Sequence, residues 1–123
     1  MGRKKKQSHT RPGWHGRLWL EGDEGTFIGY GRAVLLEKIQ LHGSIARAAT
    51  EMRMSYKHAW NLVESMNRQA GSPVVITRRG GSHGGGAGLT DTGLNLLQLF
   101  WRVQKKMEAI LDEESVTWLQ KDA

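Results

Sequence analysis

Hydrophobic positions along the chain follow two different periods, which predict a small set of strands and helices. Between residues 17 and 30, polar and apolar residues alternate around a turn sequence, Gly22-Asp23-Glu24-Gly25, and this pattern predicts a β-hairpin. Farther along, apolar residues recur every three or four positions, as they do on the buried face of a helix. This second pattern predicts three helices, over residues 31–42, 45–52 and 56–69.

The second and third predicted helices are joined by about three residues, which is the spacing of a helix-turn-helix. Ser44 and Ser55 stand immediately before them, and serine is a favoured helix N-cap. Gly43 follows the first helix as a plausible stop. A plain helical hairpin has the same spacing, so the helices alone leave both interpretations open.

A second β-hairpin is predicted directly after these helices. Residues 73–79 contain a run of strand formers, residues 87–90 are predicted as a short return strand, and a glycine-rich loop, 80–86, separates them. A hairpin in this position is the wing of a winged helix-turn-helix. The predicted fold class is therefore mainly α with small antiparallel β-hairpins.

The last predicted helix runs from Gly93 to about Leu111. Its apolar stripe is longer than three short helices would cover, so we expect a second copy of the chain to pack against it. Asp112, Glu113 and Glu114 follow, and we expect the helix to stop or fray there because acidic residues are unfavourable near a helix C-terminus. The predicted organisation is an arm over 1–16, a winged domain over 17–90, and a dimerisation helix with a tail over 91–123.

Charge adds an expected partner class. The 123 residues carry 18 Lys+Arg against 12 Asp+Glu, a formal net charge of +6. A small domain this basic usually meets nucleic acid or an acidic membrane surface. Residues 1–16 hold much of the excess, and we expect them to be disordered: either a solubilising tail or an arm that lies along DNA phosphates or in a minor groove.

Composition also excludes several classes. The chain has no cysteine, which rules out disulfides, thiolate metal sites and cysteine nucleophiles. The longest apolar run has four residues, 33–36, so we expect no membrane span, no secretory signal and a cytoplasmic protein.

Catalytic and cofactor motifs gain no support. The glycine loop lacks the Lys-Ser/Thr and following helix of a phosphate-binding loop, and it does not lie in a βαβ unit. The five histidines are scattered, and no carboxylate pair looks buried. We therefore expect neither an enzyme nor a metal or cofactor bound by this chain.

The residues carry a family resemblance. The segments 43–49 (GSIARAA) and 54–60 (MSYKHAW), Asn67, the wing segment 80–87 and the sequence Leu89-Thr90 with Gly93 resemble the winged helix-turn-helix of the ModE-type molybdate-responsive regulators, which is related to the LysR-type reader heads. The resemblance covers about Trp19 to Leu111. It implies a homodimer that binds a pseudo-palindromic operator, with the segment 55–61 in the major groove and with a link to molybdate or other oxyanion metabolism.

The resemblance also implies that the first and last helices form the dimer interface. Full-length members of the family carry C-terminal oxyanion-binding domains, and this chain ends at Ala123, so molybdate binding by the chain itself is not expected. The expected interface residues are Leu36, Leu96, Leu97, Phe100, Val103, Met107 and Ile110.

In a winged helix-turn-helix, the first turns of the recognition helix meet base edges, while the preceding helix and the wing contact the backbone. Lys57 fits a phosphate or guanine, Asn61 fits adenine, and Trp60 is open between DNA contact and packing between the helices. The expected DNA-binding residues are Ser44, Arg47, Ser55, Tyr56, Lys57, His58, Trp60, Asn61, Arg78, Arg79, Ser82 and His83.

Two other interpretations stay open from the sequence. A nucleoid-type protein would use the same basic surface without sequence preference. An interaction adaptor would cover the long apolar helix with a different partner chain. Sequence-specific transcriptional regulation is the hypothesis that the motifs favour.

Overall fold

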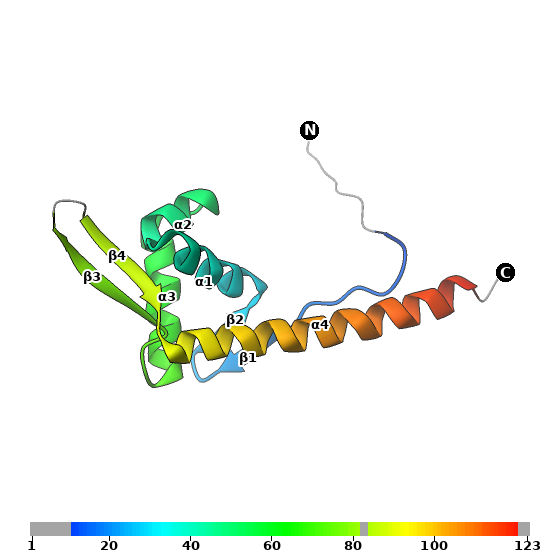
Figure 1. Ribbon diagram of the computed structural model, residues 1–123. Coiled ribbons are helices and arrows are strands. Elements are labelled where there is room, and N and C mark those ends of the chain that lie inside the picture. Colours follow the sequence, from blue (N-terminus) through cyan, green and yellow to red (C-terminus); the bar gives the residue numbers. More distant parts are fainter. Residues whose placement is uncertain (1–10, 82–83, 121–123) are drawn as a thin grey trace. The chain divides into compact units, whose positions relative to one another are not determined.

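A computed structural model describes residues 11–81 and 84–120 of the chain (Figure 1). Within these ranges the chain forms two compact units, one spanning Arg17–Gln104 and the other combining residues 11–16 with residues from Lys105 onward. The elements are β1 (Trp19–Gly22), β2 (Gly25–Gly29), α1 (Tyr30–His42), α2 (Ile45–Glu51), α3 (Tyr56–Ala70), β3 (Val75–Gly81), β4 (Gly84–Leu89) and α4 (Asp91–Gln120). This is the mainly α, winged helix-turn-helix architecture that the pattern predicts.

Serine hydroxyls begin the two helices of the helix-turn-helix. The Ser44 hydroxyl accepts a hydrogen bond from the Arg47 backbone N–H at 3.1 Å, and the Ser55 hydroxyl accepts one from His58 N–H at 3.0 Å. Gly43 ends α1 with a left-handed φ of 66°, a conformation that suits glycine. These caps confirm the helix boundaries predicted between α1 and α3.

The core of the larger unit lies between α1 and the elements around it. Leu35, Leu36 and Ile39 of α1 are fully buried, and side chains from each of the other helices and from both hairpins pack into the same cluster. Each buried aliphatic side chain contributes about 1.5–3 kcal/mol. The other buried members include Ile28, Ala48, Ala59, Val63, Met66, Val74 and Phe100.

One asparagine joins the wing to α3. The Asn67 side-chain oxygen accepts hydrogen bonds from the backbone N–H groups of Val74 and Val75, at 2.7 and 3.2 Å. Its amide nitrogen donates to the Val75 carbonyl at 3.3 Å. The amide therefore satisfies backbone groups at the start of β3 that would otherwise be buried without partners.

The returning strand of the wing is held by α1. The Gln40 side-chain oxygen accepts from Leu89 N–H at 3.1 Å, and the carbonyl of Gly43 accepts from Ala87 N–H at 2.9 Å. The base of the wing is thus tied to two helices. In Figure 1 the hairpin projects from this base beside α2 and α3.

Two predicted boundaries need correction. The helix expected to stop near Asp112–Glu114 continues to Gln120. The acidic residues therefore lie outside the last turn, where the dipole effect is concentrated. The loop expected over 80–86 is much shorter, because β3 and β4 pair as far as Gly81 and Gly84. A strand ladder is made by backbone groups and needs no side chains.

The smaller unit pairs the start of the described chain with the end of α4. The Trp14 backbone N–H donates to the Ser115 hydroxyl at 2.6 Å. A Cβ added at Gly16 would lie 3.3 Å from a Leu111 methyl group, so the backbone passes close to the helix there. Residues 11–16 form no helix or strand. The first ten residues of the expected arm lie outside the described ranges.

A carboxylate bridges α1 and α2. Glu51 accepts from Lys38 Nζ at 2.9 Å and lies 3.1 Å from His42 Nε2. The hydrogen bond from Lys38, and then the one from His42, lower the pKa of Glu51 below its usual 4.5. The same hydrogen bond raises the pKa of Lys38.

This bridge predicts a loss of stability in acid. A carboxylate whose pKa is lower in the folded state stabilises the fold above its unfolded pKa, and the contribution is lost as pH falls through the folded value. We expect the free energy of unfolding, measured by urea denaturation, to fall more below pH 4.5 in the native chain than in a Glu51→Gln variant. If the free energy of unfolding falls equally with pH in the two proteins, the stabilising role assigned to Glu51 is wrong.

Candidate nucleic-acid interface

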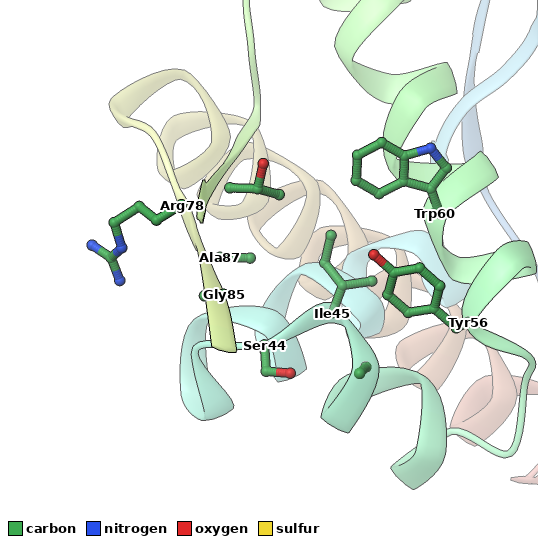
Figure 2. Close-up of a pocket in the computed structure, with 10 residues that line it drawn as sticks. Ser44, Ile45, Tyr56, Trp60, Arg78, Gly85 and Ala87 are labelled. Carbon is green, nitrogen blue, oxygen red and sulfur yellow. The ribbon is translucent and has the colours of Figure 1, made fainter. Parts of the chain in front are cut away.

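A cleft of about 360 Å³ lies between the helix-turn-helix and the wing. Figure 2 shows α2 and α3 on one side of it and the β3–β4 hairpin on the other. Three parts of the predicted site therefore meet at one opening. The residues that line it are Ser44, Ile45, Ala46, Tyr56, Trp60, Thr77, Arg78, Gly85, Gly86 and Ala87.

The first two turns of α3 present polar side chains to solvent. Lys57, His58 and Asn61 are exposed, whereas Ala59 on the opposite face is fully buried. Tyr56 is 54% exposed and its ring stacks on Trp60, with centroids 6.4 Å apart and planes 18° from parallel. Trp60 is half-buried: it packs against the core, which is one of the two roles that the sequence left open, and it also lines the cleft.

Exposed cations lie on α2 and on the wing, and one of them, Arg78, lines the cleft. Arg47 is exposed on α2, and Arg78 and Arg79 are exposed on β3. Within the described ranges, the ion pairs involve Lys38, His42 and Arg68. The side chains of Arg47, Lys57, Arg78 and Arg79 therefore have no described carboxylate within 4.0 Å and keep their charge available to an anion.

The wing backbone passes close to the residue that ends α1. A Cβ added at Gly86 would lie 3.4 Å from both the Arg78 guanidinium and the Gly43 carbonyl. Ser82 and His83, the predicted contacts at the tip of the wing, lie outside the described residues.

Sequence reasoning overlooked one cation. Arg53, in the turn between α2 and α3, is exposed and has a left-handed φ of 59°, which is uncommon for a residue other than glycine. The turn is closed by a hydrogen bond from Arg53 N–H to the Thr50 carbonyl at 3.1 Å. A short turn between two capped helices is usually exposed, so the position of Arg53 in the sequence already indicated that its side chain is accessible.

The predicted dimer residues fall into two groups. Leu36, Leu96 and Phe100 are at most 9% exposed and belong to the core. Leu36 has no exposed surface to offer a second copy, which corrects its expected role in the interface. Val103 and Ile110 are 42% and 60% exposed, and Leu97 and Met107 are half-buried.

An apolar groove of about 190 Å³ opens beside Val103. It lies between the first hairpin and α4. It is lined by Leu18, Trp19, Leu20, Ile28, Leu96, Leu99, Phe100 and Val103.

Two kinds of feature are absent from the described residues. They contain no group of three or more His, Cys, Asp or Glu side chains that could hold a metal ion. No helix in the described ranges is long and apolar enough to cross a membrane.

Comparison with known proteins identifies relatives in one family. No family model matches the chain. It is 38% identical over 99 residues to the molybdenum transport protein ModE of Azotobacter vinelandii, covering 80% of this chain and 37% of that protein. It is 38% identical over 102 residues to the transcriptional regulator ModE of Haemophilus influenzae, with 80% and 40% covered. It is 35% identical over 100 residues to the DNA-binding transcriptional dual regulator ModE of Escherichia coli, with 79% and 38% covered.

The fold has a counterpart among solved structures. ArgP from Mycobacterium tuberculosis superimposes with a TM-score of 0.51 at 19% sequence identity, over 68% of this chain and 30% of that one. The chain spans about two fifths of the length of the curated ModE proteins that it matches. Over about four fifths of its own length, the chain is homologous to a part of the ModE-type regulators.

Proposed function

We propose that the chain binds double-stranded DNA through the surface formed by α2, α3 and the wing, and that it regulates transcription. The observation that carries this proposal is that the polar first turns of α3, with the exposed Lys57, lie beside a cleft whose other side carries Arg78 of the wing. Relatives at 35–38% identity are named as transcriptional regulators, which supports the same function.

The geometry favours a division of roles between α3 and the cations around it. Lys57 and Asn61 lie on the exposed side of the first turns of α3, where base edges in the major groove are read. Asn61 suits the paired donor and acceptor of adenine. Arg47, Arg78 and Arg79 suit phosphate oxygens, and Arg78 and Arg79 also suit a narrow minor groove beneath the wing.

We further propose that two copies bind a pseudo-palindromic operator. The apolar groove beside Val103 and Leu99 gives this interface its surface. Two copies related by a two-fold axis prefer half-sites separated by about one helical turn or a multiple of it.

The regulated process is proposed to be molybdenum metabolism. The relatives include a protein named for molybdenum transport and others named as molybdenum-pterin-binding proteins. A direct effect of molybdate is tested by including it in the binding measurements.

The experiment is a fluorescence-anisotropy titration of the purified chain on DNA from its own upstream region and on a scrambled duplex, at several salt concentrations, with and without molybdate. Specific regulators bind their sites about 10³-fold or more tightly than other DNA. Equal and steeply salt-dependent binding to both duplexes would instead support a nucleoid-type protein.

Two substitutions separate phosphate contacts from base contacts. Arg47→Ala should weaken binding to both duplexes alike and reduce the slope of log Kd against log salt by about 1. Asn61→Ala should weaken binding to the specific duplex about ten- to a hundred-fold and leave scrambled DNA almost unaffected. Arg102→Ala, at an exposed cation of α4, is the matched control for loss of charge. If Asn61→Ala weakens both duplexes equally, its role as a base reader is wrong.

A further inference from the structure

The side of the cleft formed by the helices is mainly apolar, with the hydroxyls of Ser44 and Tyr56 as its polar groups. Tyr56 and Trp60 stack on each other along α3, and Ile45 and Ala46 of α2 line the cleft with them. The Tyr56 ring is more than half exposed although the surrounding surface is polar and cationic. Such a surface gains most from a partner that is itself apolar.

Charge lies on the other side of the cleft. Arg78 belongs to the wing, and Figure 2 shows its side chain directed away from the aromatic pair. Among the described residues, no ion pair or cation–aromatic contact involves Tyr56 or Trp60. The aromatic pair therefore brings no cation to a phosphate, and its polar groups are the neutral Tyr56 hydroxyl and Trp60 indole N–H.

The position of the pair selects the part of DNA that it would meet. Tyr56 is the first residue of α3, directly after the Ser55 cap, and the first turn of a recognition helix faces base edges. The apolar group that a base presents in the major groove is the C5-methyl group of thymine. A deoxyribose carbon would offer similar chemistry from the backbone.

We propose that the Tyr56 ring reads thymine through its C5-methyl group, and that Trp60 is a positioning residue that holds the ring by stacking. This inference rests on the proposed function, because it names which feature of duplex DNA the same surface recognises. The proposal predicts that the chain prefers T·A over the other base pairs at the position that faces the first turn of α3.

Replacing thymine by uracil tests the proposal on the DNA side. A tight-binding duplex is first selected from a random library by the native chain, and each dT is then replaced singly by dU. This change removes the methyl group and leaves the sugar, the phosphate and the base pairing in place. At one or two positions in each half-site, the Kd should rise about three- to five-fold, the effect of exposing one buried methyl group.

Three variants assign the methyl contact to Tyr56. Tyr56→Ala should weaken binding to the thymine duplex and abolish the difference between thymine and uracil. Tyr56→Phe keeps the ring and should keep the difference. Tyr30→Ala removes a tyrosine of similar exposure from α1 and should also leave it unchanged. Because Tyr56 is exposed, its removal should not unfold the domain, which circular dichroism would verify.

The possible outcomes are distinguishable. Specific binding that no uracil substitution weakens would overturn the thymine reading, would assign the pair to the deoxyribose, and would leave the proposed function standing. A uracil effect that persists in Tyr56→Ala would assign the methyl contact to another residue and would also overturn it. Failure to select any duplex, or tighter binding to single-stranded oligonucleotides, would overturn both proposals.

Discussion

Replacing Gly93 by alanine is expected to destabilise the fold by about 3 kcal/mol and to lower Tm by roughly 10 °C. Gly93 is buried in the first turn of α4, and an added Cβ would collide with the carbonyl oxygen of Val74. That oxygen accepts a hydrogen bond from Thr90 N–H at 3.0 Å. The Thr90 hydroxyl in turn accepts from Gly93 N–H at 3.0 Å and caps α4. Moving the backbone apart to make room would break these hydrogen bonds.

Gly31→Ala is the matched control. Gly31 is an exposed residue of α1, and an added Cβ there would meet no atom within 4 Å. Alanine at this helical position should raise the free energy of unfolding by up to about 1 kcal/mol. Thermal denaturation of both variants measures the contrast. Equal Tm values for the two variants would mean that the junction of α4 and β3 accommodates the added methyl group without loss of stability.

The second large effect concerns association. Leu99→Asp should convert a dimer into a monomer at micromolar concentration, because a carboxylate would replace apolar surface at the centre of the proposed interface. Affinity for a duplex with two half-sites should then fall about a hundred-fold or more, because the two copies no longer bind as one unit. Leu99 is 42% exposed, so the domain itself should stay folded.

Sedimentation equilibrium and anisotropy measure the two effects on the same samples. Gln98→Asp adds an acidic residue at the neighbouring exposed position, which does not line the groove, and should leave the mass and the affinity nearly unchanged. A native chain that sediments as a monomer would count against the interface. A Leu99→Asp variant that forms a dimer as stable as that of the native chain would also count against the interface.

Much of the helix-turn-helix could be predicted from the sequence because its signals are local. Ser44, Ser55 and Gly43 act on backbone groups within four residues of themselves, so residue type is enough to place the helix ends. The stripe along α3 is equally local. Exposure of Lys57 and Asn61 follows from burial of Ala59 and Val63 on the other face.

The remaining features depend on contacts between distant parts of the chain. Arg32 of α1 donates to the Ser65 hydroxyl at 3.0 Å and to the Phe27 carbonyl at 3.3 Å, and burial lowers its pKa. The spacing of these three residues along the sequence does not indicate that they contact one another. Leu36 illustrates the same difficulty. The helical period predicts that Leu36 is buried, but it does not predict whether the same domain or a second copy of the chain covers it. The cleft, likewise, is formed by four elements, α2, α3, β3 and β4.

The Asn67 amide has a consequence for the shape of the DNA. Because this amide fixes the start of β3 to α3, a change in the distance between the recognition helix and the wing would break its hydrogen bonds. A duplex whose groove widths do not match that distance must itself bend or twist, and the energy of doing so depends on its base steps. On the proposed function, flexible pyrimidine–purine steps between the two contacts would bind more tightly than stiff ones, although no side chain touches them.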